Sequence, residues 1–596
     1  MASSPITANS DIVTFQVLSN GSPINDTFQI KSIVVTKEVN KISNCEITLL
    51  DGDVNNEDFP ISDSDTFLPG AQIEVKMGYE GVNATVFKGI VMKQGLKVSP
   101  ESGSILEVVC NDEAIKMTVG RKNANYTKTT DSSIITKVIG NYGGLTADVN
   151  ATSNELPEVV QYYATDWDFM LSRAEFNGMI VTTDGGTVAV KDPNNQADVV
   201  LDVTYGKDII EFDASLDATN QFQTVTSNAW DFNSQKIVSG QAQLSNYTQG
   251  NVTNSSLAKV IGLDDFQLQS TVPLDNGSLK TWAKAQTTKS KFSKIRGQMS
   301  FQGSALALPG KLININGMGD RFNGDAFISG VRHVVRDGNW ITEVDMGLSA
   351  EWFSDKVRLE APLASGLLPG IQGLQNATVK RIDQDPDGEF RVLVDVPIIE
   401  QKGEGIWARF SNLYATNNAG SFFFPEIGDE VILGFLNEDP RFPVILGSLY
   451  NSNSKVPPYT PDQTNSTKAI ISKSQLKFIF DDENKVVTVI TPGNNQMVWS
   501  DKEQSITIKD QNENSIEMSS SGITIKSASN LTFQAAEAIN IKAGAAVSIQ
   551  ATASVSAKGA NVSIQADMAA EVKGGMTTTV SGGTEVSIKG AMVMIN

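Results

Sequence analysis

Few residues of this chain have the type and spacing that catalysis or metal binding requires. The 596 residues include one histidine, His333, and two cysteines, Cys45 and Cys110. His333 lies in the alternating run FISGVRHVVRDG, which contains no nucleophile elbow, so we interpret it as a strand histidine whose hydrogen bonds are satisfied. Both cysteines are embedded in apolar, strand-like runs and are interpreted as small core residues. These counts exclude a disulfide framework and a Cys/His zinc site.

Two acidic runs match the spacing of a calcium loop only in part. In the run 383–388 aspartates alternate before a glycine, but Val394 occupies the twelfth position of that loop, where a bidentate glutamate is required. We interpret this run as the tip of a hairpin. The run 51–55 lacks a glycine at the sixth position and is weaker still. The sequence therefore predicts no catalytic residue, no metal site and no cofactor, in a protein that is not an enzyme.

The composition is that of a folded, acidic protein. Hydrophobic residues make up 40% of the chain and charged residues 19%, which is enough to build packed cores. Lys and Arg number 47 against 68 Asp and Glu, so the net charge is −21, and the basic excess that binds DNA or RNA phosphates is missing. The amino-terminal segment has no basic or apolar stretch typical of a signal peptide. We therefore expect synthesis in the cytoplasm without a signal peptide.

The first region expected from the sequence spans residues 1–357. Short alternating apolar segments separated by Gly, Pro, Asn and Asp clusters predict antiparallel strands, among them FQIKSIVVTKEV and SILEVVCND. Three helices are expected. One begins at the capping-box spacing of Thr165 and Asp168, one is capped by Asp131, and one lies at SLKTWAKAQTTKSK.

The two ends of this region repeat one pattern. A Pro-Gly turn, an alternating strand, a Phe-x-Gly strand entry and a closing strand occur at 69–112 and again at 309–347. We interpret the repeat as a duplication. It predicts a hub domain, residues 1–357, that contains two related small β-barrels with helical insertions between them.

A Gly/Pro-rich linker, residues 358–375, leads to a compact block at 376–458. At least five strand-like runs in so short a segment predict a five-stranded barrel of the oligonucleotide/oligosaccharide-binding (OB) type. Its aromatic run, 422–424, is surrounded by acidic residues, whereas OB domains that stack bases need a basic groove. We interpret the block as a packing barrel and not as a nucleic-acid platform.

After a neck at 459–500, the segment 501–596 follows one simple pattern. Pairs of apolar residues separated by one position recur mostly every eight residues from Ile523 onward. The two members of a pair point to the same face of a strand. They form the predicted core: Ile523, Ile525, Leu531, Phe533, Ile539, Ile541, Val547, Ile549, Val562, Ile564, Val586 and Ile588.

One such repeat cannot fold alone. Burying two side chains gives roughly 3–6 kcal/mol, whereas ordering eight backbones costs roughly 8–16 kcal/mol. The period has two solutions: a single chain coiled as a solenoid, or identical chains wrapped round one axis with a shared core. We favour three chains, because small apolar pairs fill a narrow axis without voids. The fold class predicted is mainly β, with a homotrimeric triple-stranded β-helix as the needle.

The last residues of the sequence would leave an apolar edge open at the end of that needle. An unpaired strand edge is normally blunted in isolated proteins. We therefore expect a capping partner to bind there, at Met592, Val593, Met594, Ile595 and Asn596.

Three segments resemble the VgrG-type spike proteins of type VI secretion and of extracellular phage-tail-like injection particles. They are residues 159–181, 322–335 and 422–458, and the last contains P-E-x-G-D-E-V, then G-F and a D-P-x-x-P-x-x-x-G-S-x-Y tail. The resemblance implies a homotrimer at the centre of a contractile baseplate. It also implies six hub barrels per trimer that match a hexameric inner tube, baseplate hub proteins as neighbours, and a PAAR-type tip protein at the carboxyl-terminal end.

The function expected on this basis is mechanical. The trimer would join the inner tube to the membrane-piercing tip, transmit the contraction force and touch the target membrane only transiently, without binding nucleic acid. After assembly into an injection particle it would be extracellular or delivered into the target cell. The alternative is a trimeric β-prism stalk or fibre that acts as an adhesin or binding module.

Overall fold

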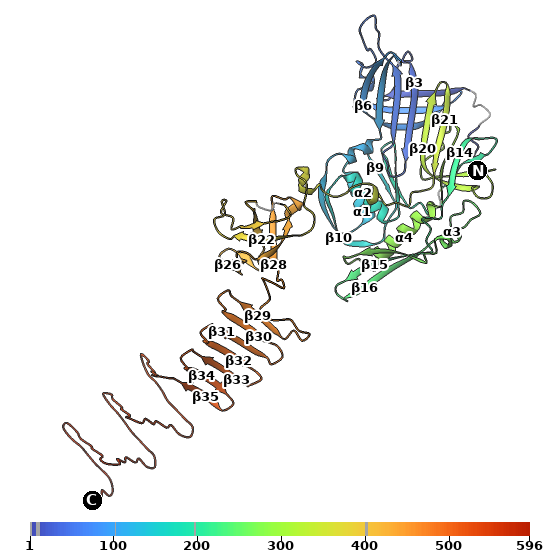
Figure 1. The fold of residues 1–596 in the computed structure, drawn as a ribbon. Coiled ribbons are helices and arrows are strands. Elements are labelled where there is room, and N and C mark those ends of the chain that lie inside the picture. The colour runs from blue at the N-terminus through green and yellow to red at the C-terminus, as the bar shows by residue number, and fades with distance from the viewer. Residues whose placement is uncertain (1–2, 7–11, 102, 196–197, 400–402, 596) are drawn as a thin grey trace. The chain divides into compact units, whose positions relative to one another are not determined.

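The computed structural model describes residues 3–6, 12–101, 103–195, 198–399 and 403–595. The chain divides into two compact units, Met1–Ser448 and Leu449–Asn596. The first unit contains a large sheet, its helices and a closed barrel, and the second contains a smaller sheet and the carboxyl-terminal segment (Figure 1). Among the described residues, no helix combines the length and the apolar character that a membrane crossing requires.

The first unit begins with a set of strands that follow the predicted apolar alternation. Alternate side chains point to one side of a strand, so residues such as Ile33, Val75 and Leu106 are buried in a single core. Six of the strands pair in the order β1-β5-β6-β7-β4-β3. The bounds are β1 (Val13–Ser19), β2 (Ser22–Pro23), β3 (Ile30–Glu38), β4 (Asn44–Leu50), β5 (Gln72–Tyr79), β6 (Val82–Ser99) and β7 (Gly103–Asn111).

A second set of six strands pairs in the order β13-β19-β20-β21-β18-β14. Numbered along the chain, both sets follow the order first, fourth, fifth, sixth, third, second. They differ in one pairing, because β13 is parallel to β19 whereas β1 is antiparallel to β5. The bounds are β13 (Val199–Thr204), β14 (Ile209–Leu216), β18 (Ile295–Gln302), β19 (Leu312–Asn316), β20 (Gly324–Arg336) and β21 (Asn339–Met346).

The two sets share one 13-stranded sheet, and each surrounds a buried core of its own. That they form two related small β-barrels stays a prediction. The strand that joins them is β20, which is 13 residues long. Its first residues pair with β19, and its later residues pair with β3, from Gly330 with Glu38 to Arg336 with Ser32. A strand of this length reaches two cores, since Ile328 is buried in the second core and Val335 in the first.

A helical insertion lies between the two sets in sequence. Thr165 caps α2 (Asp166–Phe176) as predicted, because its Oγ1 accepts a hydrogen bond from the amide of Asp168 at 3.0 Å. In α1 (Asp131–Gly140), however, the cap is Thr130, and the prediction that Asp131 caps this helix is wrong. Around these helices lie β8 (Lys122–Thr130), β9 (Thr146–Val149), β10 (Glu155–Ala164), β11 (Ile180–Asp184) and β12 (Thr187–Lys191).

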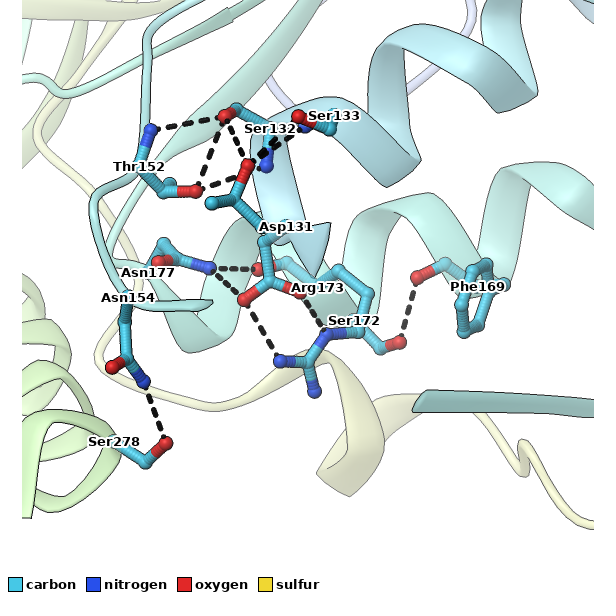
Figure 2. A network of polar contacts seen from close by, with 11 residues as sticks. Asp131, Ser132, Ser133, Thr152, Asn154, Phe169, Ser172, Arg173, Asn177 and Ser278 are labelled. Carbon is cyan, nitrogen blue, oxygen red and sulfur yellow. Dashed lines mark hydrogen bonds and ion pairs between the residues drawn. The ribbon is translucent and has the colours of Figure 1, made fainter. Parts of the chain in front are cut away.

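The carboxylate of Asp131 binds α2 instead. Figure 2 shows Arg173 of α2 and Asn177, the residue that follows α2, converging on it. Arg173 Nε and Nη2 lie 2.6 and 2.9 Å from its two oxygens, and Asn177 Nδ2 donates to it at 2.8 Å. The Asp131 side chain is only 4% exposed, so this bidentate pair compensates a nearly buried charge and locks the start of α1 to α2.

The third predicted helix, α4 (Asn276–Phe292), packs on one side of the three-stranded sheet β16-β15-β17 (Figure 1). Gly240 permits this close approach, because a Cβ there would lie 2.5 Å from the backbone nitrogen of Lys280. The buried hydroxyl of Ser227 donates to the carbonyl of Leu279 at 2.6 Å. The bounds are β15 (Thr224–Asp231), β16 (Lys236–Gln243) and β17 (Asp265–Ser270); α3 (Asn254–Ile261) and α5 (Phe353–Lys356) were not expected.

The compact block forms a closed five-stranded barrel, as predicted. Its strands pair in the order β22-β23-β24-β28-β27, and β24 is parallel to β28. Val379, Val394 and Leu433 are among the side chains buried in its core. The bounds are β22 (Gln375–Arg381), β23 (Val392–Asp395), β24 (Ile406–Phe410), β27 (Glu430–Phe435) and β28 (Pro443–Ser448), with the short hairpin β25 (Ala415–Thr416) and β26 (Ala419–Gly420) between β24 and β27.

The second unit contains a meander of seven strands in which each strand is antiparallel to the next. It continues past residue 500, where a boundary between neck and needle was expected, and ends at Lys526. Within 527–595, all of which is described, no strand occurs. The bounds are β29 (Thr467–Ile471), β30 (Lys477–Asp481), β31 (Val486–Ile490), β32 (Gln496–Ser500), β33 (Ser505–Lys509), β34 (Ser515–Ser519) and β35 (Gly522–Lys526).

Candidate assembly interface

The pairing register of the meander gathers most of its large apolar side chains on one face, where Lys468 is the one charged residue. Residues directly opposite each other on neighbouring strands lie on the same face of a sheet, and Phe478 pairs with Val489, which pairs with Met497. Two columns therefore run across all seven strands, and together we call them the apolar face. The first column is Ile470, Phe478, Val489, Met497, Ile508, Ile516 and Ile525, and the second is Lys468, Phe480, Val487, Trp499, Ile506, Met518 and Ile523.

The apolar face remains open to solvent in the single chain. Phe478 is 36% exposed, Trp499 38% and Ile523 70%. The other face is mixed in β29 to β32, but in β33 to β35 it is entirely polar or glycine: Ser505, Thr507, Lys509, Ser515, Glu517, Ser519, Gly522, Thr524 and Lys526. A continuous exposed apolar surface on one side of such a sheet marks a site of interaction. Its amphipathic character identifies the face that a partner must cover.

The predicted tail core continues from this face. Ile523 and Ile525 end the two columns in β35, and the other predicted core residues follow in 527–595. All of these others are exposed, from 47% for Val586 to 86% for Ile564. Within one chain, these side chains have no partner that buries them.

The predicted tip residues are also exposed. Met592, Val593, Met594 and Ile595 present their side chains to solvent in the single chain. Asn596 lies outside the described residues.

Sequence reasoning missed the upper part of the apolar face. Its pairs have the same spacing of two as the tail pairs, but they follow one another at intervals of mostly nine or ten residues, because the hairpin turns between them are longer. A search for alternating apolar pairs without a fixed period would have found them. They are Phe478/Phe480, Val487/Val489, Met497/Trp499, Ile506/Ile508 and Ile516/Met518.

His333 is a buried residue of β20, as interpreted from the sequence. Its side chain is 1% exposed, and its Nδ1 lies 3.0 Å from Oγ1 of Thr342 on the neighbouring strand β21. Burial, together with nearby Lys37, lowers its pKa to about 3. The imidazole is therefore neutral at pH 7.

The cysteines and Asp385 of the acidic run 383–388 also have structural roles. Cys45 and Cys110 face each other across β4 and β7, buried and free, and burial raises the pKa of Cys110 to about 12. Asp385 lies in the hairpin between β22 and β23, where hydrogen bonds from Arg391 hold its pKa well below its usual range. In the part of the chain that is described, no group of three or more His, Cys, Asp or Glu could hold a metal ion.

Known families match two parts of the chain. Residues 9–337 match the family described as Alg8 N-terminal domain. Residues 375–450 match the family described as type VI secretion system/phage-baseplate injector OB domain, and they coincide with the closed barrel β22 to β28.

The chain is also similar to individual proteins. It is 37% identical over 103 residues to the type VI secretion system spike protein VgrG1c of Pseudomonas aeruginosa, covering 16% of this chain and 14% of that one. With VgrG1b of the same bacterium it shares 34% identity over 123 residues, covering 19% and 17%. The matched segments thus span less than a fifth of these relatives. Among solved structures, the c3393 protein of E. coli, described as a component of the type VI secretion system, matches with 15% identity over 73% of this chain and 100% of that one, at a TM-score of 0.38.

The chain thus contains the type VI secretion system/phage-baseplate injector OB domain and is similar to VgrG spike proteins over short segments. Over more than half of its length, the chain belongs to the family described as Alg8 N-terminal domain.

Proposed function

We propose that this protein is the central spike of a contractile injection system baseplate. In this role it acts as a homotrimer that joins a hexameric inner tube to a membrane-piercing tip and transmits the force of contraction. The observation that carries the proposal is the apolar face, which runs through all seven strands of the meander and leads directly into the tail pairs.

Three copies with their apolar faces turned inward form a three-sided prism. In β33 to β35 the choice of inner face follows from the chemistry, because the opposite face is polar. Each isoleucine or methionine that becomes fully buried stabilises the assembly by about 1.5–3 kcal/mol. The three copies of Trp499 would meet at one level of this core.

The tail gives a separate reason for shared strands. In 527–595 the backbone forms no strand within the chain, and buried N–H and C=O groups need hydrogen-bond partners. Sister chains wound round the same axis supply both the apolar cover and the backbone partners. This arrangement is the triple-stranded β-helix, with the predicted pairs from Ile523 to Ile588 as its core.

The hub supports a match to a hexameric tube. Its two strand sets follow the same order along the chain, which favours their origin by duplication. A trimer therefore presents six similar strand sets to the tube. In the tail, the exposed residues from Met592 to Ile595 are the proposed seat of a conical tip protein.

The proposed role involves no covalent chemistry and no cofactor. The free energy for puncture comes from sheath contraction, and the spike must transmit force without buckling. A prism held by many ladder hydrogen bonds suits this task, because bending has to break several bonds together. In this role the protein is assembled into a particle and then reaches the outside of the cell or the target cell.

Two measurements on the full-length protein test the proposal. Sedimentation equilibrium should give three times the mass of one chain, and a tagged chain should co-purify with tube and sheath subunits from cells that assemble the particle. A monomeric chain would refute the shared core. A trimer that never associates with tube or sheath would support the adhesin or stalk alternative instead.

A further inference from the structure

The small sheet β16-β15-β17 presents an unusual polar face on the side opposite α4. Residues such as Val225, Ala229 and Gly240 point toward α4 and are buried. The alternate residues point outward and are exposed or partly exposed. Pairing in register arranges them in three rows of three: Gln243, Thr224 and Asp265; Gln241, Thr226 and Gln267; Ser239, Asn228 and Gln269.

The side chains of these rows hold one another in place, and we call the three rows the amide face. Ser239 Oγ donates to Asn228 Oδ1 at 2.6 Å, and Thr226 Oγ1 donates to Asp265 Oδ1 at 2.8 Å. Gln241 Nε2 donates to Thr226 Oγ1 at 3.3 Å. A side-chain amide has two donor hydrogens and two acceptor lone pairs, and a hydroxyl has one donor hydrogen and two acceptor lone pairs. Further hydrogen bonds join Asn228 to Gln267 and Gln267 to Asp265. Each amide nevertheless keeps at least one donor hydrogen for a ligand.

An aromatic end closes the amide face. In the row after Ser239 and Asn228, Ile237 pairs with Trp230, whose side chain is 45% exposed. Phe232, in the turn that follows β15, is 62% exposed. The exposed indole of Trp230 thus lies at one end of the three rows.

The lack of basic side chains on the amide face excludes polyanions as its partner. The three rows contain no Lys or Arg and one acidic residue, Asp265, so they lack the groups that bind nucleic-acid phosphates or acidic sugars. They also lack the apolar centre that is typical of protein interfaces. A neutral polyol has the complementary chemistry, because its hydroxyls exchange hydrogen bonds with amides and its C–H faces pack on an aromatic ring.

We propose that the amide face, together with Trp230, binds a neutral glycan. Alternate residues of one strand lie about 6.8 Å apart and neighbouring strands about 4.8 Å apart, so several hydroxyls of one extended sugar chain can be engaged at once. Trp230 stacks against a sugar ring at the end of the rows. This activity is additional to the mechanical role and does not depend on it.

Isothermal titration of the full-length protein tests the proposal. The probes are a soluble N-acetylglucosamine hexamer and a glucose hexamer, with polygalacturonate as the acidic counterpart. We expect at least one neutral hexamer to bind at millimolar or lower concentration and the polygalacturonate not to bind. Trp230→Ala should weaken binding about tenfold, Trp230→Phe should retain most of it, and Phe423→Ala, which changes an exposed aromatic residue of the OB barrel, should leave it unchanged.

Three outcomes would overturn the proposal. They are the absence of binding to both neutral hexamers, equal binding by the Trp230→Ala variant, and preferential binding of the acidic polymer. Asn228→Lys gives a further check, because it places a charge within the rows. If this variant changes the mass of the assembly in solution, the amide face is a contact between copies and not a glycan site.

Discussion

Replacing Ile508 by aspartate should prevent the three chains from assembling. Ile508 belongs to the first column of the apolar face, between Met497 on β32 and Ile516 on β34. In the proposed trimer three copies of this side chain meet in the core. Ile508→Asp removes an apolar group and introduces a carboxylate at the same level in all three chains.

The size of the effect follows from transfer free energies. Loss of the buried isoleucine costs about 1.5–3 kcal/mol per chain, and burial of an unpaired carboxylate costs several kcal/mol more. If each substitution costs about 5 kcal/mol, the three chains together lose about 15 kcal/mol of assembly free energy. Since 1.4 kcal/mol changes an equilibrium constant tenfold, roughly ten orders of magnitude in the trimerisation constant are lost.

The assay is light scattering coupled to size-exclusion chromatography on the full-length chain. Thr507→Asp is the matched control, because Thr507 is the adjacent residue of β33 on the polar face and pairs with Glu517. We expect Ile508→Asp to elute as a monomer and Thr507→Asp as a trimer. If Ile508→Asp stays trimeric with an unchanged melting temperature, or if both variants dissociate equally, the apolar face is not the shared core.

Three further predictions concern the first unit. His333 has a pKa of about 3 in the folded chain, against an ordinary value of 6.5, so between these pH values the unfolded chain binds a proton that the folded chain does not. Stability therefore falls as the pH drops from about 6.5 toward 3, by up to about 1.4 kcal/mol per pH unit. In calorimetry over this range, the melting temperature of His333→Gln should fall less steeply than that of the unchanged protein, and an identical slope would contradict the assignment. Arg173→Met leaves the nearly buried carboxylate of Asp131 without its cationic partner and should lower the free energy of unfolding by about 3–5 kcal/mol. In denaturant titration much of this loss should return when Asp131→Asn is added, and a loss of the same size in the double variant would count against the ion pair. Gly240→Ala places a methyl group against the backbone of α4 and should cost about 1–3 kcal/mol in the same titration, whereas Gln241→Ala on the outer face should change stability by no more than about 0.5 kcal/mol.

Local patterns predicted the elements of the fold well. Helix α2 follows from the cap at Thr165 and the apolar stripe behind it, and the closed barrel follows from five dense strand-like runs. Burial of His333 also follows from its alternating strand. In these cases a few neighbouring residues contain the whole signal.

What could not be predicted depends on contacts between distant residues. Asp131 has the chemistry of a helix cap, but Arg173, 42 positions away, holds its carboxylate, and Thr130 caps the helix in its place. That the two strand sets of the hub join in one sheet depends on β20 pairing with β3, about 300 residues earlier in the chain, which no local pattern encodes. The apolar face above Ile523 was missed because turn length varies between its hairpins, so that its pairs have no constant period.

In the proposed trimer, the contrast between the varied meander and the uniform tail has a consequence for how the three chains align. Repeats that are nearly alike tolerate a slip by one whole repeat, since each apolar pair meets an equivalent pair after the shift. The meander forbids this slip, because Phe478, Phe480 and Trp499 occur at single levels and fit only their own counterparts. The register of the three chains should therefore be set at the meander and propagate toward the carboxyl terminus. Chains without residues 467–526 should assemble with their repeats shifted against one another, which leaves unpaired ends of unequal length.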